Sequence, residues 1–66
     1  MKINSVIFDK ELFTSEQMQA YLNNHKLDFI EETDGKLYHI FTIEESLDIA
    51  YKYFEPEQGI KYLCKF

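Results

Sequence analysis

The chain has 66 residues, and its twelve acidic residues outnumber its seven lysines to give a formal net charge of −5. This length allows one domain, residues 1–66, and no apolar run is long enough for a transmembrane helix or resembles a secretion signal, so we expect a cytoplasmic protein. One cysteine excludes an internal disulfide, and the complete lack of arginine argues against direct binding of nucleic acid, because arginine best recognises phosphates and bases.

The first third of the chain predicts a strand followed by a helix. Residues 3–8 are rich in strand-forming side chains, and the apolar run at 6–8 is typical of a central strand. Thr14 and Gln17 have the spacing of a capping box, so we expect a helix from Thr14 to about residue 25. Its predicted apolar face contains Met18, Tyr21, Leu22 and His25.

The middle of the chain predicts a β-hairpin over residues 27–41. Two runs of strand-forming residues flank Asp34 and Gly35. An Asp-Gly pair suits a two-residue type I′ turn, because both of its central residues need a positive φ angle.

The last third predicts a second helix and a closing strand. Thr42 and Glu45 repeat the capping pattern, and apolar residues follow at helical spacing as far as Phe54. Pro56 and the turn at 57–59 would end this helix. Residues 60–66 alternate regularly, with Ile60, Tyr62, Cys64 and Phe66 on one face and Lys61 and Lys65 on the other.

The order of these elements is β-α-β-β-α-β, which is the split βαβ pattern of ferredoxin-like sandwiches. Right-handed crossovers would place both helices on one face of a four-stranded antiparallel sheet. We therefore predict a compact α+β ferredoxin-like sandwich.

This topology would gather most of the carboxylates at one end of the molecule. The end of the first strand, the hairpin tip and the end of the second helix would all lie there. Two interpretations are open: the acids form a solvating surface, or they engage a basic groove as a nucleic-acid mimic would. The residues of this predicted acidic end are Asp9, Glu11, Glu31, Glu32, Asp34, Glu55 and Glu57.

A second candidate surface is the sheet face away from the helices. If Leu37, His39 and Phe41 face the helices, Tyr38 and Ile40 lie outside and are joined by Leu63. Aromatic residues on such a face bind RNA in some proteins of this fold, but the negative net charge favours contact with a protein or with a second copy of the chain.

The chain has few candidates for chemistry, and we predict no catalytic residue, no metal site and no cofactor. His25 would lie at a helix end and His39 within a sheet, with no ligand set around either. Cys64 is expected in the core, without a base beside it. Glu31 and Glu32 are adjacent, so they would point to opposite faces of a strand.

Short motifs along the chain resemble a small module of phage and prophage head-morphogenesis proteins. These are the strand Val6-Ile7-Phe8, the helix start Phe13-Thr14, the pair Tyr21-Leu22, the hairpin arm from Tyr38 to Phe41, and Gly59-Ile60. The arginines that usually follow the hairpin tyrosine in that module are missing here. The resemblance implies a small stand-alone interaction protein of phage or mobile-element origin.

We therefore predict a small non-enzymatic interaction protein. In the leading hypothesis it is phage-encoded and inhibits a basic, nucleic-acid-handling host or defence protein through its predicted acidic end. In the alternative it is a structural or dimerisation module that uses Tyr38, Ile40 and Leu63. Binding of RNA on that same face is a third hypothesis.

Overall fold

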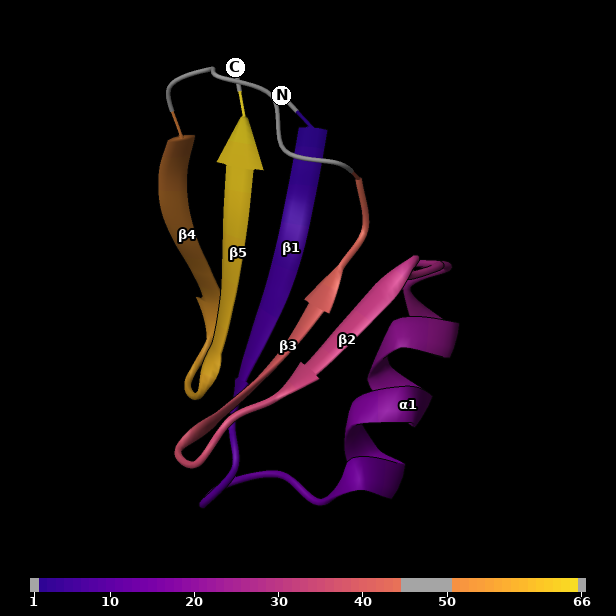
Figure 1. The fold of residues 1–66 in the computed structure, drawn as a ribbon, viewed down its shortest axis with the longest axis vertical. Coiled ribbons are helices and arrows are strands. Elements are labelled where there is room, and N and C mark those ends of the chain that lie inside the picture. Colours follow the sequence, from indigo (N-terminus) through magenta and orange to yellow (C-terminus); the bar gives the residue numbers. More distant parts are fainter. Residues whose placement is uncertain (1, 45–50, 66) are drawn as a thin grey trace.

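The computed structural model describes residues 2–44 and 51–65, and these residues form one helix and five strands. The strands lie in the order β2-β3-β1-β5-β4, and every neighbouring pair is antiparallel (Figure 1). β1 is therefore the central strand, as its apolar run predicted. In chain order the elements are β1 (Lys2–Asp9), α1 (Ser15–Asn24), β2 (Glu31–Asp34), β3 (Tyr38–Thr42), β4 (Tyr51–Glu57) and β5 (Ile60–Lys65).

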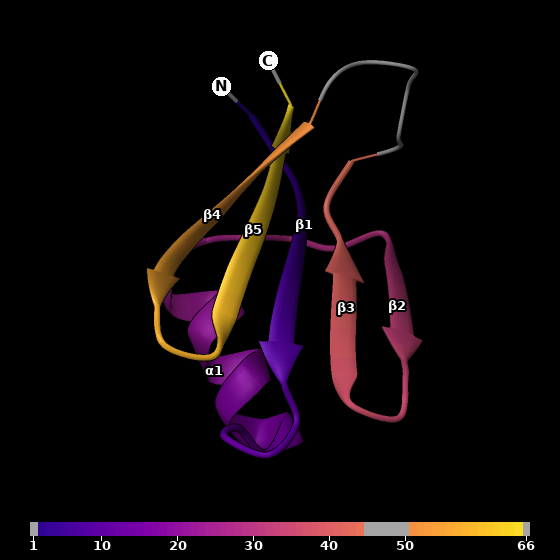
Figure 2. The ribbon, with the colours of Figure 1, turned by 90° about the vertical axis from the view of Figure 1, so that its left-hand side faces the viewer.

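The ferredoxin-like prediction is wrong. Of its two helices only α1 is present in the described part of the chain, and the sheet has five strands instead of four. α1 lies against one face of this sheet, as the view in Figure 2 shows. The opposite face carries no helix from the described residues.

From Tyr51 onward, the edge strand β4 stands in place of the predicted second helix. Thr42 is not an N-cap, because it belongs to β3 and pairs with Ser5 and Glu31. The prediction for residues 45–50 lies outside the described residues. β5 pairs with β1 on one side and with β4 on the other, where Tyr53 is in register with Leu63. The aromatic residues of β4 favour this strand.

The end of β4 shows how proline and glycine are accommodated. Pro56 has no N–H group, and it lies in an edge strand where the register shifts between Phe54 and Glu57. Gly59 has a φ angle of +86°, which closes the turn between β4 and β5. A β-carbon there would also come within 2.7 Å of the Leu12 side chain. The predicted turn is confirmed at Gln58 and Gly59, whereas Glu57 is the last residue of β4 and a strand, not a helix, precedes the turn.

The β2–β3 turn differs from the predicted type I′ turn at Asp34 and Gly35. Asp34 is the last residue of β2 and pairs with His39. Gly35 N–H donates to the Tyr38 carbonyl at 2.9 Å, so the chain reverses over Lys36 and Leu37. Gly35 does not have a positive φ angle, but a β-carbon there would lie 2.9 Å from the same carbonyl oxygen. Close backbone approach therefore favours glycine at this position.

The helix prediction is confirmed. Thr14 is the N-cap, its hydroxyl accepts from Gln17 N–H, and the Gln17 side chain accepts from Thr14 N–H. This reciprocal capping box begins α1 at Ser15. His25 is the C-cap, as predicted, and its ring stacks on Tyr21.

The core lies between α1 and the inner face of the sheet, and Phe8 is at its centre. The Phe8 ring makes edge contacts with Phe13, Tyr21 and Phe41, each with ring centroids 5.6 Å apart. Cys64 is buried on the same face, which confirms its predicted place in the core. The other buried apolar residues are Val6, Met18, Leu22 and Ile60.

Candidate functional site

Three connections meet at one end of the sheet, which we call the turn end. They are the loop after β1, the β2–β3 turn and the β4–β5 turn (Figure 1). Asp9 N–H donates to the Gly59 carbonyl at 2.8 Å, and Lys10 N–H donates to the Leu37 carbonyl at 3.1 Å. These two hydrogen bonds join all three connections. The β4–β5 turn lies where the end of the second helix was expected, so the acids of this region still reach the turn end.

Not all residues of the predicted acidic end lie at the turn end. Glu31 and Glu32 are opposite Thr42 and Phe41, further along β2. Asp34 does lie there, and it forms an ion pair with Lys10. This contact, mainly through its hydrogen bond, lowers the pKa of Asp34 below its ordinary value.

The acids at the turn end also span the width of the sheet. Residues in register across all five strands run from Asp34 through His39, Phe8 and Ile60 to Glu57. Four strand spacings of about 4.8 Å separate the two end residues by ~19 Å. The carboxylates at the turn end are therefore spread across the sheet and do not form a compact cluster, and that of Asp34 is in an ion pair with Lys10.

His39 is buried beside two acids of β2. The residue is 7% exposed, and its ring stacks on Phe41, with centroids 4.5 Å apart. Nε2 lies 3.0 Å from Glu32 Oε1 without hydrogen-bond alignment, and Nδ1 lies 3.7 Å from Asp34 Oδ1. Each carboxylate therefore lies nearest to a different nitrogen of the His39 ring. Across residues 2–44 and 51–65 there is no group of three or more His, Cys, Asp or Glu side chains that could hold a metal ion.

The outer face of the sheet, which points away from α1, carries the second candidate surface. Ile7 is in register with Ile40 and with Lys61, and Tyr53 is in register with Leu63. Directly opposed residues of antiparallel strands share a face. The outer face therefore includes all three residues predicted for it, together with Lys61, which the alternation of residues 60–66 also places there, and it adds Ile7 and Tyr53.

The two added residues differ in how far the sequence could have revealed them. Ile7 follows from strand alternation around Phe8. Tyr53 could not be found in this way, because it was assigned to a helix. It is 66% exposed, whereas Leu37, which was expected to face the helices, is an exposed residue of the β2–β3 turn.

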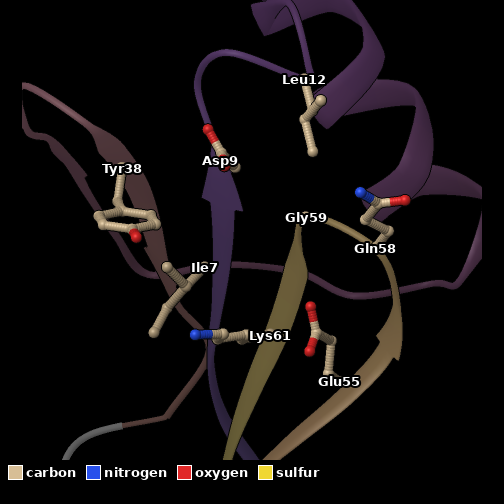
Figure 3. Close-up of a pocket in the computed structure, with 8 residues that line it drawn as sticks. All are labelled: Ile7, Asp9, Leu12, Tyr38, Glu55, Gln58, Gly59 and Lys61. Carbon is tan, nitrogen blue, oxygen red and sulfur yellow. The ribbon is translucent and has the colours of Figure 1, made fainter.

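Two adjacent hollows lie on the outer face and share Ile7, Tyr38 and Lys61. The first, which we call the apolar hollow, has a volume of about 260 Å³ and is completed by Ile40 and Tyr53. The second, which we call the acidic hollow, has a volume of about 200 Å³ and lies toward the turn end (Figure 3). Its further lining residues are Asp9, Leu12, Glu55, Gln58 and Gly59.

The Cys64 thiol and the Tyr21 hydroxyl lie away from both hollows. Cys64, the one thiol of the chain, is buried on the inner face. Tyr21 shares a short hydrogen bond with Tyr62 inside the core, and burial, with that bond, raises the pKa of the Tyr21 hydroxyl. These groups contribute to packing, and neither lines the two hollows.

The outer face is thus an open surface of aromatic and aliphatic side chains with charged groups at its turn end. None of the helices in the described ranges has the length and apolar composition needed to cross a membrane. Searches against protein-family models, curated proteins and solved structures find no match for this chain.

Proposed function

We propose that this chain is a small non-enzymatic interaction module that binds a protein partner through the outer face of its sheet. The observation that carries the proposal is the exposure of Tyr38 and Tyr53 around the apolar hollow, on a face that α1 does not cover. Exposed aromatic residues around a depression are typical of protein-binding surfaces, because their burial supplies much of the binding energy.

Charge favours a protein partner over RNA on this face. The chain carries a net charge of −5, and Lys61 is the one basic side chain among the described residues that line the two hollows. Phosphate contacts supply most of the affinity for nucleic acids, so an acidic surface disfavours an RNA ligand. We accordingly rank binding of a protein first.

The turn end supports a second candidate function, which is inhibition of a basic, nucleic-acid-handling protein. Its support is that Glu11, in the loop after β1, and Glu57, the last residue of β4, are both exposed at this end of the sheet. The ion pair of Asp34 and the placement of Glu31 and Glu32 reduce the charge available there. We therefore place this function second.

The proposed setting is the cytoplasm, or the interior of a host cell if the chain is encoded by a phage. A reducing compartment suits a lone buried thiol such as Cys64. The phage origin rests on the short motifs that resemble a head-morphogenesis module.

Paired variants of one edge strand test the leading proposal. Tyr53 and Phe54 are adjacent in β4 and are 66% and 57% exposed. Tyr53 lies on the outer face, whereas Phe54 pairs with Tyr62 on the inner side. Affinity capture from a nuclease-treated lysate, read by mass spectrometry, should yield a partner with the parent chain and with Phe54→Asp, and lose it with Tyr53→Asp.

The same assay separates the two candidate functions. Glu11→Lys with Glu57→Lys should leave capture intact if the outer face binds the partner, and should abolish it if the turn end does. Circular dichroism establishes that each variant remains folded. Capture that survives Tyr53→Asp but not the double charge reversal would overturn the leading proposal in favour of the second.

A further inference from the structure

We propose that the acidic hollow receives an arginine side chain of the partner, while the apolar hollow receives an aliphatic side chain of the same segment. This inference rests on the proposed function, because it specifies the chemistry of the partner that the outer face binds. It is argued from the size, the charge and the lining of the two hollows.

The size of the acidic hollow suits one side chain. Its volume of about 200 Å³ is several times that of a water molecule. It is smaller than the ~300–1,000 Å³ of typical small-molecule and cofactor sites. The end of one long side chain can fill this space.

The charge of the acidic hollow favours a cationic side chain. Asp9 and Glu55 line it with two carboxylates, and Lys61 supplies one ammonium group, so the lining carries one net negative charge (Figure 3). Asp9 Oδ1 accepts from the Glu11 N–H at 2.9 Å, which orients the carboxylate. Among the described residues neither Glu55 nor Lys61 has an ion pair, so Glu55 can accept one from a partner.

Tyr38 makes arginine a better occupant than lysine. Its ring lines both hollows and lies beside Ile7 in Figure 3. A guanidinium group can stack on an aromatic face and form two parallel hydrogen bonds to a carboxylate, whereas a lysine ammonium is a compact point charge. The combination of Tyr38 with Asp9 or Glu55 fits the planar cation.

The apolar hollow specifies the neighbouring side chain of the partner. Ile40 and Tyr53 complete it, and they are in register with Ile7 and Leu63 on the same face. Side chains two positions apart in an extended segment point to the same side. An arginine followed two residues later by leucine can therefore reach both hollows from one extended chain.

A second copy of this chain is not the proposed occupant. The sequence contains no arginine, and each copy carries a net charge of −5, so two copies repel each other. A basic segment of a different protein has the complementary charge.

Nuclear magnetic resonance with short synthetic peptides tests the inference on the full chain. The probe is acetyl-Arg-Ser-Leu-amide, and its control is the same peptide with citrulline, which keeps the shape of arginine but has no charge. We expect roughly millimolar binding, with shifts at the amides of Asp9, Gly59 and Lys61, and clearly weaker binding of the citrulline peptide. Equal binding of the two peptides would overturn the inference.

Single-charge variants test the location. Lys61→Met removes the competing ammonium, so the arginine peptide should bind about two- to fivefold more tightly, while Asp9→Asn and Glu55→Gln should each weaken it by a similar factor. Lys2→Met is the matched control, since it changes the net charge equally at an exposed position in the first residue of β1, far from the turn end. Equal tightening by Lys2→Met and Lys61→Met would mean that only the overall charge matters, which contradicts the inference.

Failure here is distinguishable from failure of the proposed function. If the peptide does not bind but Tyr53→Asp still abolishes capture of the partner, the arginine inference is wrong and the outer-face proposal stands. If Tyr53→Asp leaves capture intact, the outer-face proposal fails, and the arginine inference, which rests on it, falls as well.

Discussion

Asn4 Nδ2 donates a hydrogen bond to the backbone carbonyl of Glu44 at 2.8 Å, across 40 residues of sequence. Asn4 is buried at the point where the register of β1 against β5 shifts, and its Oδ1 accepts from the Ser5 hydroxyl at 2.7 Å. Its backbone carbonyl also accepts from the amides of Ile43 and Glu44. Through its side chain and its backbone carbonyl, Asn4 thus holds the segment that follows β3 against the central strand.

Asn4→Ala should lower the free energy of unfolding by about 1–3 kcal/mol, because it removes the donor to Glu44 and the acceptor of Ser5 inside the protein. Urea denaturation measures the change. The control is Asn23→Ala, at an exposed helix position, where a change within about 0.5 kcal/mol is expected. Equal stability of Asn4→Ala and the parent chain would contradict the role given to this hydrogen bond.

Thr14→Ala should destabilise the protein by about 1 kcal/mol, because the Thr14 hydroxyl satisfies an N–H group at the start of α1. Ser15→Ala is the matched control, since it removes a neighbouring hydroxyl that does not cap the helix. Thermal unfolding followed by circular dichroism compares the two. A larger loss for Ser15→Ala than for Thr14→Ala would show that the cap is assigned to the wrong residue.

Gly59→Ala should destabilise the β4–β5 turn by about 1–3 kcal/mol, because the residue has a positive φ angle and its new methyl group would meet Leu12 and Phe13. Gln58→Ala, in the same turn and exposed, is the control and should change stability little. Urea titrations of the two variants provide the comparison. An unchanged midpoint for Gly59→Ala would rule out this turn geometry.

Acid should weaken the fold through Asp34. The hydrogen bond and the charge of Lys10 hold the pKa of Asp34 below its ordinary value of 3.8 in the folded protein. A lowered folded-state pKa means that the contribution to stability is present above pH 3.8 and is lost as the pH falls through the folded-state pKa. Carbon-detected titration of the Asp34 carboxyl group should therefore give a midpoint below 3.8 in the parent chain.

Lys10→Met should return the midpoint of Asp34 toward its ordinary value, because it removes both favourable contacts of the carboxylate. Lys36→Met, in the same turn region, is the control and should leave the midpoint low. Both effects should decrease at high salt, since the pair is exposed to solvent. An Asp34 midpoint that is the same in Lys10→Met and in the parent chain would contradict the ion pair.

Local sequence patterns correctly predicted the elements whose signals act over a few residues. The capping box at Thr14 defines the start of α1, because it satisfies helix N–H groups within one turn of chain. The alternation from Ile60 predicts both the strand β5 and its buried face, with Ile60 and Cys64 inside. The position of the β4–β5 turn follows from Gly59, and the buried places of His39 and Cys64 follow from alternation.

Long-range pairing determined the rest. The spacing of Tyr51 and Phe54 fits a helix as well as a strand. The strand is favoured because the backbone groups along the free edge of β5 gain hydrogen-bonding partners when β4 pairs there, with Tyr53 opposite Leu63. The same pairing places Tyr53 in the lining of the apolar hollow and Glu55, with Asp9, in the lining of the acidic hollow, which no spacing along the chain reveals. The sequence by itself thus specifies the helix, the central strand and the acidic charge, whereas the binding surface depends on which strands become neighbours, since residues from four strands line each hollow.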